Sequence, residues 1–409
     1  MNRREFLRVS MAAGVTAATS RWAGAVEAEA GGAEAGGGRI KPYVLGADVS
    51  WLLEDEAEGA TYWDRGVQKD LLAILKSYGF NWIRARIFVN PHAVGGYAAG
   101  RDQAFCDLEH TKRFAARIKA AGLSFLLSFH YSDTWADPAH QKKPAAWAEL
   151  PFEKLVSRVH DWTADALKAL KKNGTPPQMV SVGNETTPGM LWPDGRATDF
   201  DKFAALANAG CMAVRDFDKS VLVALHNDRG WDNLGVRWWV DHFLKRKTAF
   251  DVLGLSCYEE HRAGDWKRNF DDLAVRYPEL SLVAMEYSYR KRYLNDAVFG
   301  APNGKGLGSF IWEPTRWKEA IFDHEGVNAG NDFGNRAHLA ASTLPALDAS
   351  DQPVYRPAVE PEAGSATRPA GAAATGPATR RGRTRGGKYE TNSYILAYPE
   401  MAKAYGVRA

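Results

Sequence analysis

Met179-Val-Ser-Val-Gly-Asn-Glu-Thr-Thr187 joins a short apolar run to an amide and a carboxylate. Such a run is typical of a buried strand, and it ends directly at Gly183, Asn184 and Glu185. A simple turn would account for Gly-Asn. However, Leu282-Val-Ala-Met285 repeats the design and ends at Glu286. Two buried strands that each end in a glutamate predict a pair of carboxylates able to flank a glycosidic bond.

Strand-like runs alternate with amphipathic helical segments along most of the chain. We expect eight strands, at residues 43–49, 82–89, 123–130, 180–182, 221–226, 252–258, 282–286 and 308–312. We expect helices between them at 67–78, 108–121, 152–172, 200–215, 234–245 and 266–276. This alternation predicts an α/β fold with a parallel sheet, and eight units predict a (β/α)₈ TIM barrel. A doubly wound open sheet is the alternative, but no Gly-rich phosphate turn follows any strand.

The second predicted strand carries two arginines on one face. Ile83, Ala85 and Ile87 alternate with Arg84 and Arg86, so the two arginines point into the barrel. Buried guanidinium groups require carboxylates or a polar ligand. We expect Arg84 to keep the attacking carboxylate ionised. A purely structural salt bridge at the bottom of the barrel, its amino-terminal end, is the alternative.

Polar and aromatic residues gather at the predicted carboxyl ends of the strands, where a TIM barrel has its active site. We predict Glu185 and Glu286 as catalytic. We predict that the substrate is bound by Asp48, Arg84, Arg86, His130, Asp133, Trp135, Asn184, His226, Tyr258 and Trp312. For two of these an alternative stays open: His226 as a satisfied wall residue, and Tyr258 with its hydroxyl in water.

Composition limits the classes of partner. The chain has 14 Trp, 15 Tyr and 18 Phe, which suits a sugar-binding groove, although tryptophan also fills cores. We expect one or two of Trp135, Trp147, Trp192 and Trp312 to be core residues. The net charge of +3 favours neither nucleic acid nor an anionic membrane as partner, and we expect a monomer. The three cysteines have no metal-ligand spacing. We predict no metal site.

Both ends of the chain differ in composition from the barrel. Arg3-Arg4 and the weakly apolar run after it predict a twin-arginine-type signal peptide at 1–30, with export to the periplasm or the medium. A Gly-rich linker at 31–40 leads to the catalytic barrel at 41–350. Residues 351–388 are rich in Ala, Gly, Pro and Arg and predict a disordered insert. Residues 389–409 regain apolar side chains and predict a segment that docks on the barrel.

Several stretches resemble one known family. They are Gly46-Ala-Asp-Val-Ser-Trp51, Arg84-Ala-Arg-Ile-Phe-Val-Asn-Pro91, Phe129-His-Tyr-Ser-Asp-Thr-Trp-Ala-Asp-Pro138 with Gln141 and Lys143-Pro-Ala-Ala-Trp147, Val182-Gly-Asn-Glu-Thr186, Gly189-Met-Leu-Trp-Pro193, Pro302-Asn-Gly-Lys-Gly-Leu-Gly308 and Trp312-Glu-Pro314. Residues 43–345 thereby resemble glycoside hydrolase family 53, the endo-β-1,4-galactanases that act on arabinogalactan.

The resemblance implies a retaining barrel enzyme of clan A with a β-1,4-galactan substrate. It also implies Glu185 as acid/base, Glu286 as nucleophile, Asn184 on the sugar 2-hydroxyl and Trp312 as the floor of the cleavage subsite. The chain departs from the family at Glu286-Tyr-Ser288, where Glu-Thr is usual. We expect no required cofactor. Bacterial relatives can bind a structural calcium before the eighth strand, but 287–307 is short here, which counts against the metal.

Two other functions stay open on the sequence alone. One is a related barrel glycosidase that acts on another β-glycan, such as mannan or xylan. The other is a non-catalytic glycan-binding barrel, in which both glutamates would be dispensable. Their position at two strand ends favours catalysis.

Overall fold

The computed structural model describes residues 42–258, 262–317, 319–324 and 386–407. The predicted signal peptide, the linker up to residue 40 and most of the predicted insert lie outside these residues. Their boundaries therefore stay predictions.

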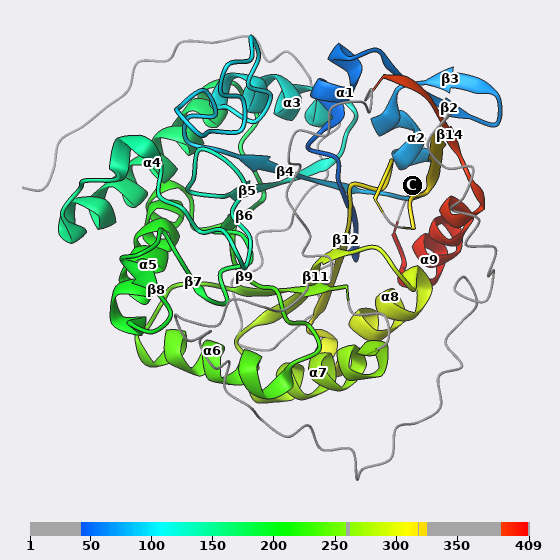
Figure 1. Ribbon diagram of the computed structural model, residues 1–409. Coiled ribbons are helices and arrows are strands. Elements are labelled where there is room, and N and C mark those ends of the chain that lie inside the picture. The colour runs from blue at the N-terminus through cyan, green and yellow to red at the C-terminus, as the bar shows by residue number, and fades with distance from the viewer. Residues whose placement is uncertain (1–41, 259–261, 318, 325–385, 408–409) are drawn as a thin grey trace, which may run out of the picture. The chain divides into compact units, whose positions relative to one another are not determined.

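Eight parallel strands close into a barrel, which confirms the predicted fold (Figure 1). In spatial order the strands are β1 (Val44–Asp48), β12 (Gly306–Trp312), β11 (Ser281–Tyr287), β10 (Val252–Cys257), β9 (Leu222–Asn227), β6 (Met179–Val182), β5 (Ser124–Phe129) and β4 (Trp82–Ile87). Because all eight strands run the same way, their carboxyl ends meet at one rim.

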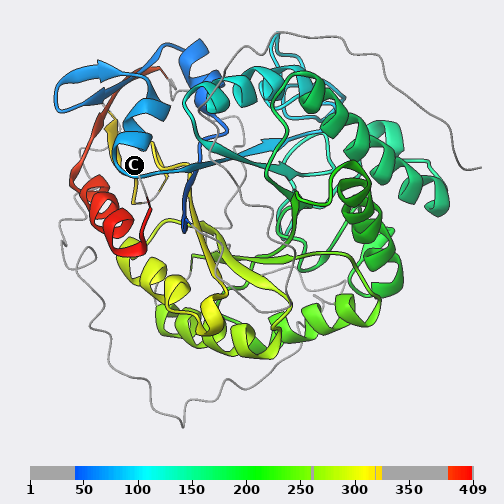
Figure 2. The same ribbon diagram turned by 180° about the vertical axis from the view of Figure 1, so that it is seen from behind.

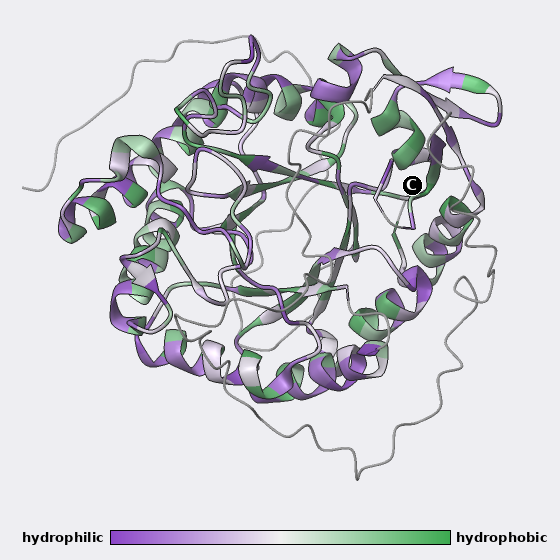
Figure 3. Ribbon diagram, viewed as in Figure 1, coloured by the Kyte–Doolittle hydropathy of each residue, from purple (hydrophilic) through white to green (hydrophobic). Residues whose placement is uncertain are grey.

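Helices surround the barrel in both views (Figures 1 and 2). They are α1 (Leu52–Ala57), α2 (Leu71–Ser77), α3 (Leu108–Ala120), α4 (Phe152–Lys172), α5 (Phe200–Phe217), α6 (Asn233–Lys245), α7 (Ala263–Arg276), α8 (Lys291–Phe299) and α9 (Ala397–Tyr405), with 3₁₀ turns at Ala145–Trp147, Pro302–Gly304 and Ser393–Leu396. Green, hydrophobic colour runs along most of the strands, and purple marks much of the helices (Figure 3). None of the described helices has the length and apolar composition needed to cross a membrane.

The amino-terminal half of the barrel is filled by a small apolar cluster. Its members are Val44, Leu126, Met179, Ala224, Val252, Val283, Met285, Leu307 and Phe310. The space is tight: a Cβ on Gly46 would lie 2.2 Å from Cδ1 of Phe310. Since side chains alternate along a strand, residues two positions further along β1 and β4 also face inward. Asp48, Arg84 and Arg86 therefore stand above this apolar floor, fully buried.

A β-bulge turns Glu286 into the barrel. Leu255 pairs with Ala284, but Ser256 pairs with Glu286, so Met285 is the extra residue on β11. Val283 and Met285 both belong to the interior cluster, and strict alternation would place Glu286 outside. The extra residue resets the alternation, because a bulge re-aims the side chains that follow it. Glu286 consequently faces inward, while Tyr287 joins the outer core.

A second, four-stranded sheet lies beside the barrel and was not predicted. Its order is β13 (Phe322–His324), β14 (Gly387–Thr391), β2 (Ala60–Asp64) and β3 (Val67–Lys69). The prediction of one helix over 67–78 was wrong at its start. Asp70 accepts a hydrogen bond from the backbone N–H of Ala73 and so begins α2 at Leu71. The predicted insert also ends two residues too late, since Gly387 and Lys388 belong to β14.

The carboxyl-terminal residues pack on the outside of the barrel. Helix α9 lies beside α8 in both views (Figures 1 and 2). Tyr398 stacks on Phe80 with ring centroids 4.2 Å apart, and its hydroxyl lies 2.8 Å from that of Tyr287. Tyr287 follows Glu286 directly in β11, so this segment contacts the strand that carries the second glutamate.

Candidate active site

The chain leaves β6 through two residues in the left-handed region. Gly183 has φ +83° and Glu185 has φ +48°. A Cβ at Gly183 would lie 2.5 Å from Cγ2 of Thr186, so glycine is required there. A non-glycine residue in this region carries strain of about 1–3 kcal/mol, which is typical of functional sites. The turn places buried Asn184 and half-buried Glu185 at the rim of the barrel.

Glu185 and Glu286 lie close together. A carboxylate oxygen of each and a ring nitrogen of His226 all lie within 4.8 Å of one another. The strands that carry the two glutamates, β6 and β11, are separated in the barrel by β9 and β10. The carboxylate pair predicted from the two strand ends is therefore present as a pair in space.

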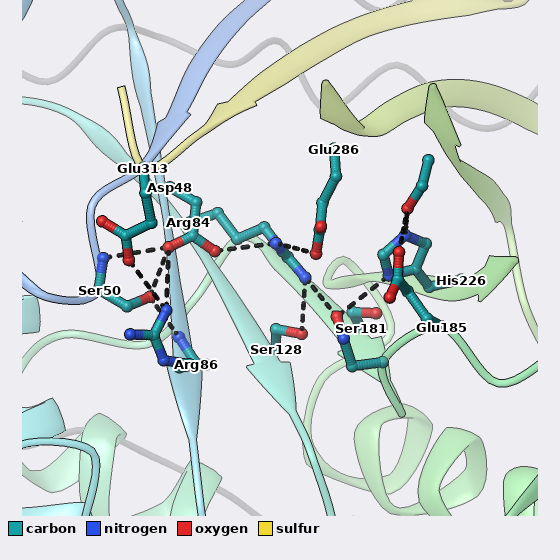
Figure 4. Close-up of polar contacts among 12 residues, drawn as sticks. Asp48, Ser50, Arg84, Arg86, Ser128, Ser181, Glu185, His226, Glu286 and Glu313 are labelled. Atoms are coloured by element: carbon teal, nitrogen blue, oxygen red, sulfur yellow. Dashed lines mark hydrogen bonds and ion pairs between the residues drawn. The ribbon is translucent and has the colours of Figure 1, made fainter. Parts of the chain in front are cut away.

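Arg84 connects three of the predicted site residues (Figure 4). Its Nη1 donates to Oδ2 of Asp48 and to Oε1 of Glu286, each at 2.8 Å. Its Nη2 donates to Oδ1 of Asn184 at 2.6 Å. The salt bridge is thus in the site itself and not at the amino-terminal end of the barrel. Tyr258 donates its hydroxyl to the other oxygen of Glu286, at 2.9 Å.

Glu185 contacts a different set of groups. The hydroxyl oxygen of Ser256 lies 2.7 Å from Oε1 of Glu185 and 2.9 Å from Nε2 of His226. The other ring nitrogen of His226 lies 3.2 Å from Oδ1 of Asn184. Figure 4 shows the side chains of His226 and Glu185 next to each other. His226 is completely buried, and its two ring nitrogens contact Asn184 and Ser256.

The two carboxylates differ in how readily they lose a proton. Burial and the charges of Glu286 and Asp228 raise the pKa of Glu185 well above its usual value. Burial also raises the pKa of Glu286, but the guanidinium of Arg84 and the hydroxyl of Tyr258 oppose this. These two donors bind Glu286 directly and favour its charged form, whereas the charge of Glu286 favours the protonated form of Glu185. The two carboxylates therefore have different electrostatic surroundings, as in enzymes that use one carboxyl as an acid and the other as a nucleophile.

A second charged cluster consists of Arg86, Glu313 and Asp48. Arg86 Nη1 donates to Oε1 of Glu313 at 3.0 Å and lies 3.8 Å from Oδ1 of Asp48. Its guanidinium carbon lies 4.1 Å from the ring centre of Trp135. Arg86 and Asp48 are buried, and these contacts join them to other residues of the site.

Aromatic rings form a wall next to the carboxylates. The ring of Trp312 lies 5.4 Å from Trp51, 6.3 Å from Trp135 and 4.8 Å from Trp317, all in edge-on arrangements. Trp135 and Trp312 both keep exposed surface at the rim, where an indole face can stack on a sugar ring. Trp147, in contrast, is a core residue.

Two predicted sugar contacts have other partners. The carboxylate oxygens of Asp133 accept backbone N–H groups from Asn90 at 2.9 Å and Ala145 at 2.7 Å, so Asp133 joins two loops. Nδ1 of buried His130 accepts the N–H of Ala136 at 3.0 Å. Burial and the nearby arginines lower the pKa of His130 well below its usual value, which keeps the ring neutral.

Glu185, His226 and Glu286 are close enough together to resemble a metal site. Both nitrogens of His226 already have hydrogen-bond partners, and Glu286 is bound by Arg84. A cation here would have to displace these contacts and would lie close to a guanidinium group. The donor set suits a carboxylate pair and does not suit a metal.

Comparison with known proteins agrees with this geometry. The model of glycosyl hydrolase family 53 matches residues 44–301. The chain belongs to this family.

Relatives of this family 53 chain cover most of its described part. An uncharacterised protein in the bgaB 5′ region of Niallia circulans is 39% identical over 336 residues, 72% of this chain and 88% of its own. An arabinogalactan endo-β-1,4-galactanase of Thermothelomyces thermophilus is 31% identical over 66% of this chain and 88% of its own. The solved family 53 catalytic domain of Ignisphaera aggregans has 32% identity and a TM-score of 0.62, with 67% of this chain and 85% of that one covered.

The sequence reasoning missed three residues of this family 53 site. Ser256 lies two positions before Tyr258 on the inner face of β10, so alternation was a signal that could have found it. Trp51 ends the first motif and packs against Trp312. Gln141 donates to the backbone oxygen of Asn184 at 2.9 Å and fixes the turn that carries Glu185.

Proposed function

We propose that this protein is an exported endo-β-1,4-galactanase that cleaves galactan with retention of configuration. The observation that carries the mechanism is the separation of the carboxylates. Retaining enzymes keep their two carboxyl groups about 5–5.5 Å apart, whereas inverting enzymes need about 6.5–9.5 Å to admit a water molecule. One oxygen of Glu185 and one of Glu286 lie within 4.8 Å of each other, which supports the first class.

In the first step Glu286 attacks the anomeric carbon while Glu185 gives its proton to the leaving oxygen. Arg84 and Tyr258 hold Glu286 ionised and fix its orientation through one hydrogen bond to each oxygen. Burial and the negative charge of Glu286 raise the pKa of Glu185, which favours the protonated form that a general acid needs. The bond to the leaving sugar breaks, and a bond from the galactosyl carbon to Glu286 forms.

In the second step Glu185, now a carboxylate, takes a proton from water. The resulting hydroxide equivalent attacks the anomeric carbon and releases Glu286, so both carboxyl groups return to their starting states. Asn184 is held by Arg84 through Oδ1 and donates through Nδ2 to the oxygen of Ala136 at 2.8 Å. We propose that its remaining N–H binds the sugar hydroxyl next to the reacting carbon.

The choice of galactan rests on the family and its named relatives. Several curated relatives carry the name arabinogalactan endo-β-1,4-galactanase, among them proteins of Thermothelomyces thermophilus and Humicola insolens. The test is incubation of the purified protein with linear β-1,4-galactan, mannan and xylan, followed by sizing of the soluble products. Mid-length galacto-oligosaccharides from galactan alone support the proposal. Release of products from mannan or xylan alone would overturn the substrate while leaving the mechanism.

Export is proposed on the amino-terminal sequence, which lies outside the described residues. Arg3-Arg4 and the small residues Ala23-Gly-Ala25 predict a mature chain that begins near Val26. Amino-terminal sequencing of protein from fractionated cells tests this. A cytoplasmic protein that retains Met1 would contradict it.

A further inference from the structure

The hydrogen-bond donors around His226 determine the direction of the hydrogen bond between Ser256 and Glu185. The side-chain amide of Asn184 has a fixed orientation, because its Oδ1 accepts from Arg84 at 2.6 Å and its Nδ2 donates to the oxygen of Ala136 at 2.8 Å. Nδ1 of His226 therefore faces an acceptor at 3.2 Å and must carry a hydrogen. The tautomer of His226 follows from its neighbours.

The second nitrogen of His226 must then accept a hydrogen bond. The ring is completely buried, and an imidazolium there would be a second buried cation near Arg84. Burial and Arg84 indeed lower the pKa of His226 well below its usual value. Neutral His226 with a hydrogen on Nδ1 offers only a lone pair at Nε2. Among the residues that the structure describes, the hydroxyl of Ser256, at 2.9 Å, is the group that can donate to it.

A serine hydroxyl has one hydrogen and two partners here. If Ser256 donates to His226, its oxygen can only accept from the other partner, Oε1 of Glu185, at 2.7 Å. If Glu185 were ionised, a lone pair of its Oε1 would face a lone pair of the Ser256 oxygen at that distance, and the two would repel each other. We propose that Ser256 and His226 are positioning residues that hold the acid proton on Glu185 in the free enzyme. This inference rests on the proposed role of Glu185 as acid/base.

The opposite direction predicts the opposite effect. If Ser256 donated to Glu185, its hydrogen bond would stabilise the carboxylate and lower the pKa of Glu185. If Ser256 accepts from Glu185, the hydrogen bond stabilises the carboxylic acid and raises that pKa. The other charged or titratable groups that face Glu185 are Glu286 on β11, Asp228 after β9, Arg84 on β4 and Tyr258 after β10. A substitution at Ser256 adds or removes no charge among these groups.

The kcat/KM profile against pH reports the pKa values of the free enzyme, and its basic limb belongs to the acid Glu185. In Ser256→Ala this limb should move to lower pH by about one unit, because the free energy of one neutral hydrogen bond corresponds to a pKa change of about one unit. The acid limb should stay in place. His226→Phe frees the hydrogen of Ser256 to donate to Glu185, so its basic limb should move down at least as far. Ser256→Thr keeps the hydroxyl and should restore the wild-type limb.

Ser309→Ala is the matched control. Ser309 is a buried barrel serine whose hydroxyl donates to Oδ1 of Asn295 at 2.8 Å, away from Glu185. This variant should lose similar stability without any shift of either limb. A basic limb that moves up in Ser256→Ala, or that does not move in either Ser256→Ala or His226→Phe, would overturn the inference.

A second readout does not depend on galactan. In protein labelled with ¹³C at the glutamate carboxyls, the signal absent from Glu185→Gln identifies Glu185, and its titration follows the proton directly. Wild-type Glu185 should stay protonated to a pH about one unit higher than in Ser256→Ala. If galactan is not the substrate but this shift is seen, the proposed substrate fails and the inference stands. If galactan is cleaved without the shift, the inference fails alone.

Discussion

Tyr258→Phe isolates one of the two groups that keep the nucleophile ionised. The substitution removes a single hydroxyl, which donates to Oε2 of Glu286 at 2.9 Å, and leaves the ring in place. A hydrogen bond to a charged group contributes about 1.5–3 kcal/mol, which corresponds to about 1–2 pKa units. Because Arg84 still donates to Oε1, we expect the lower end, about one unit.

The sign follows from which form of Glu286 the hydroxyl stabilises. Tyr258 stabilises the carboxylate and so lowers the pKa of Glu286. Without it the pKa rises, and protonated Glu286 cannot attack. The acid limb of the kcat/KM profile should therefore move to higher pH in Tyr258→Phe, measured on a soluble galacto-oligosaccharide, while the basic limb stays in place.

Tyr287→Phe is the control for general loss of stability. Its hydroxyl lies 2.8 Å from that of Tyr398 in the outer core, and it neighbours Glu286 without contacting it. This variant should unfold more easily and keep both limbs of the wild-type profile. An acid limb that stays fixed in Tyr258→Phe, or that moves to lower pH, would refute the assignment of Glu286 as the carboxylate that must be ionised.

Three further changes test the fold and the site. Gly46→Ala should lower the free energy of unfolding by about 1–3 kcal/mol, measured in urea, because the added Cβ meets Phe310. Adding Phe310→Leu should recover part of this loss. An unchanged urea midpoint in Gly46→Ala would contradict the tight packing. Tyr398→Ala should cost about 3–5 kcal/mol by the same measurement, since it removes the stack on Phe80, whereas a loss below about 1 kcal/mol would mean that α9 is dispensable. Arg84→Lys should lower kcat/KM by about 10- to 100-fold, because one ammonium cannot reach all three partners; wild-type activity would remove Arg84 from the mechanism.

Much of the barrel could be predicted because its strands are buried on both faces. Continuous apolar runs such as 180–182 and 282–285 are then bounded by polar residues at one end. Helix α4 has the predicted bounds, and strand β6 begins one residue before the predicted run. The strands β2, β3 and β14 were missed. They belong to a partly exposed sheet whose pairing joins residues more than 300 positions apart, as in Tyr62 with Tyr389.

The sequence predicted which residues gather at the site. It was less informative about which partner each side chain contacts. Period-two alternation brought Asp48, Arg84 and Arg86 inside, but it cannot reveal that they are covered. The inward direction of Glu286 depends on the extra residue Met285, and no local pattern marks a bulge. The contact of Ser256 with Glu185 depends on the registers of β10 against β9 and of β9 against β6, which are tertiary properties.

The central claim is that Glu185 acts as acid/base and Glu286 as nucleophile. Glu185→Ala should still form the glycosyl-enzyme from an aryl galactoside whose leaving group needs no proton, because acid assistance matters least there. Glu286→Ala should lose activity on every substrate, since the attacking carboxylate is gone. Added azide distinguishes the two variants, because it can take the place of either missing carboxylate.

The decisive measurement is the anomeric configuration of the galactosyl azide, read by proton NMR. Azide should attack the glycosyl-enzyme of Glu185→Ala and give the β-azide, with configuration retained. In Glu286→Ala it should enter the space of the missing nucleophile and give the inverted α-azide. If the two variants exchange these products, the roles of Glu185 and Glu286 are reversed. If both keep wild-type activity on galactan, the carboxylate pair is not the catalytic centre.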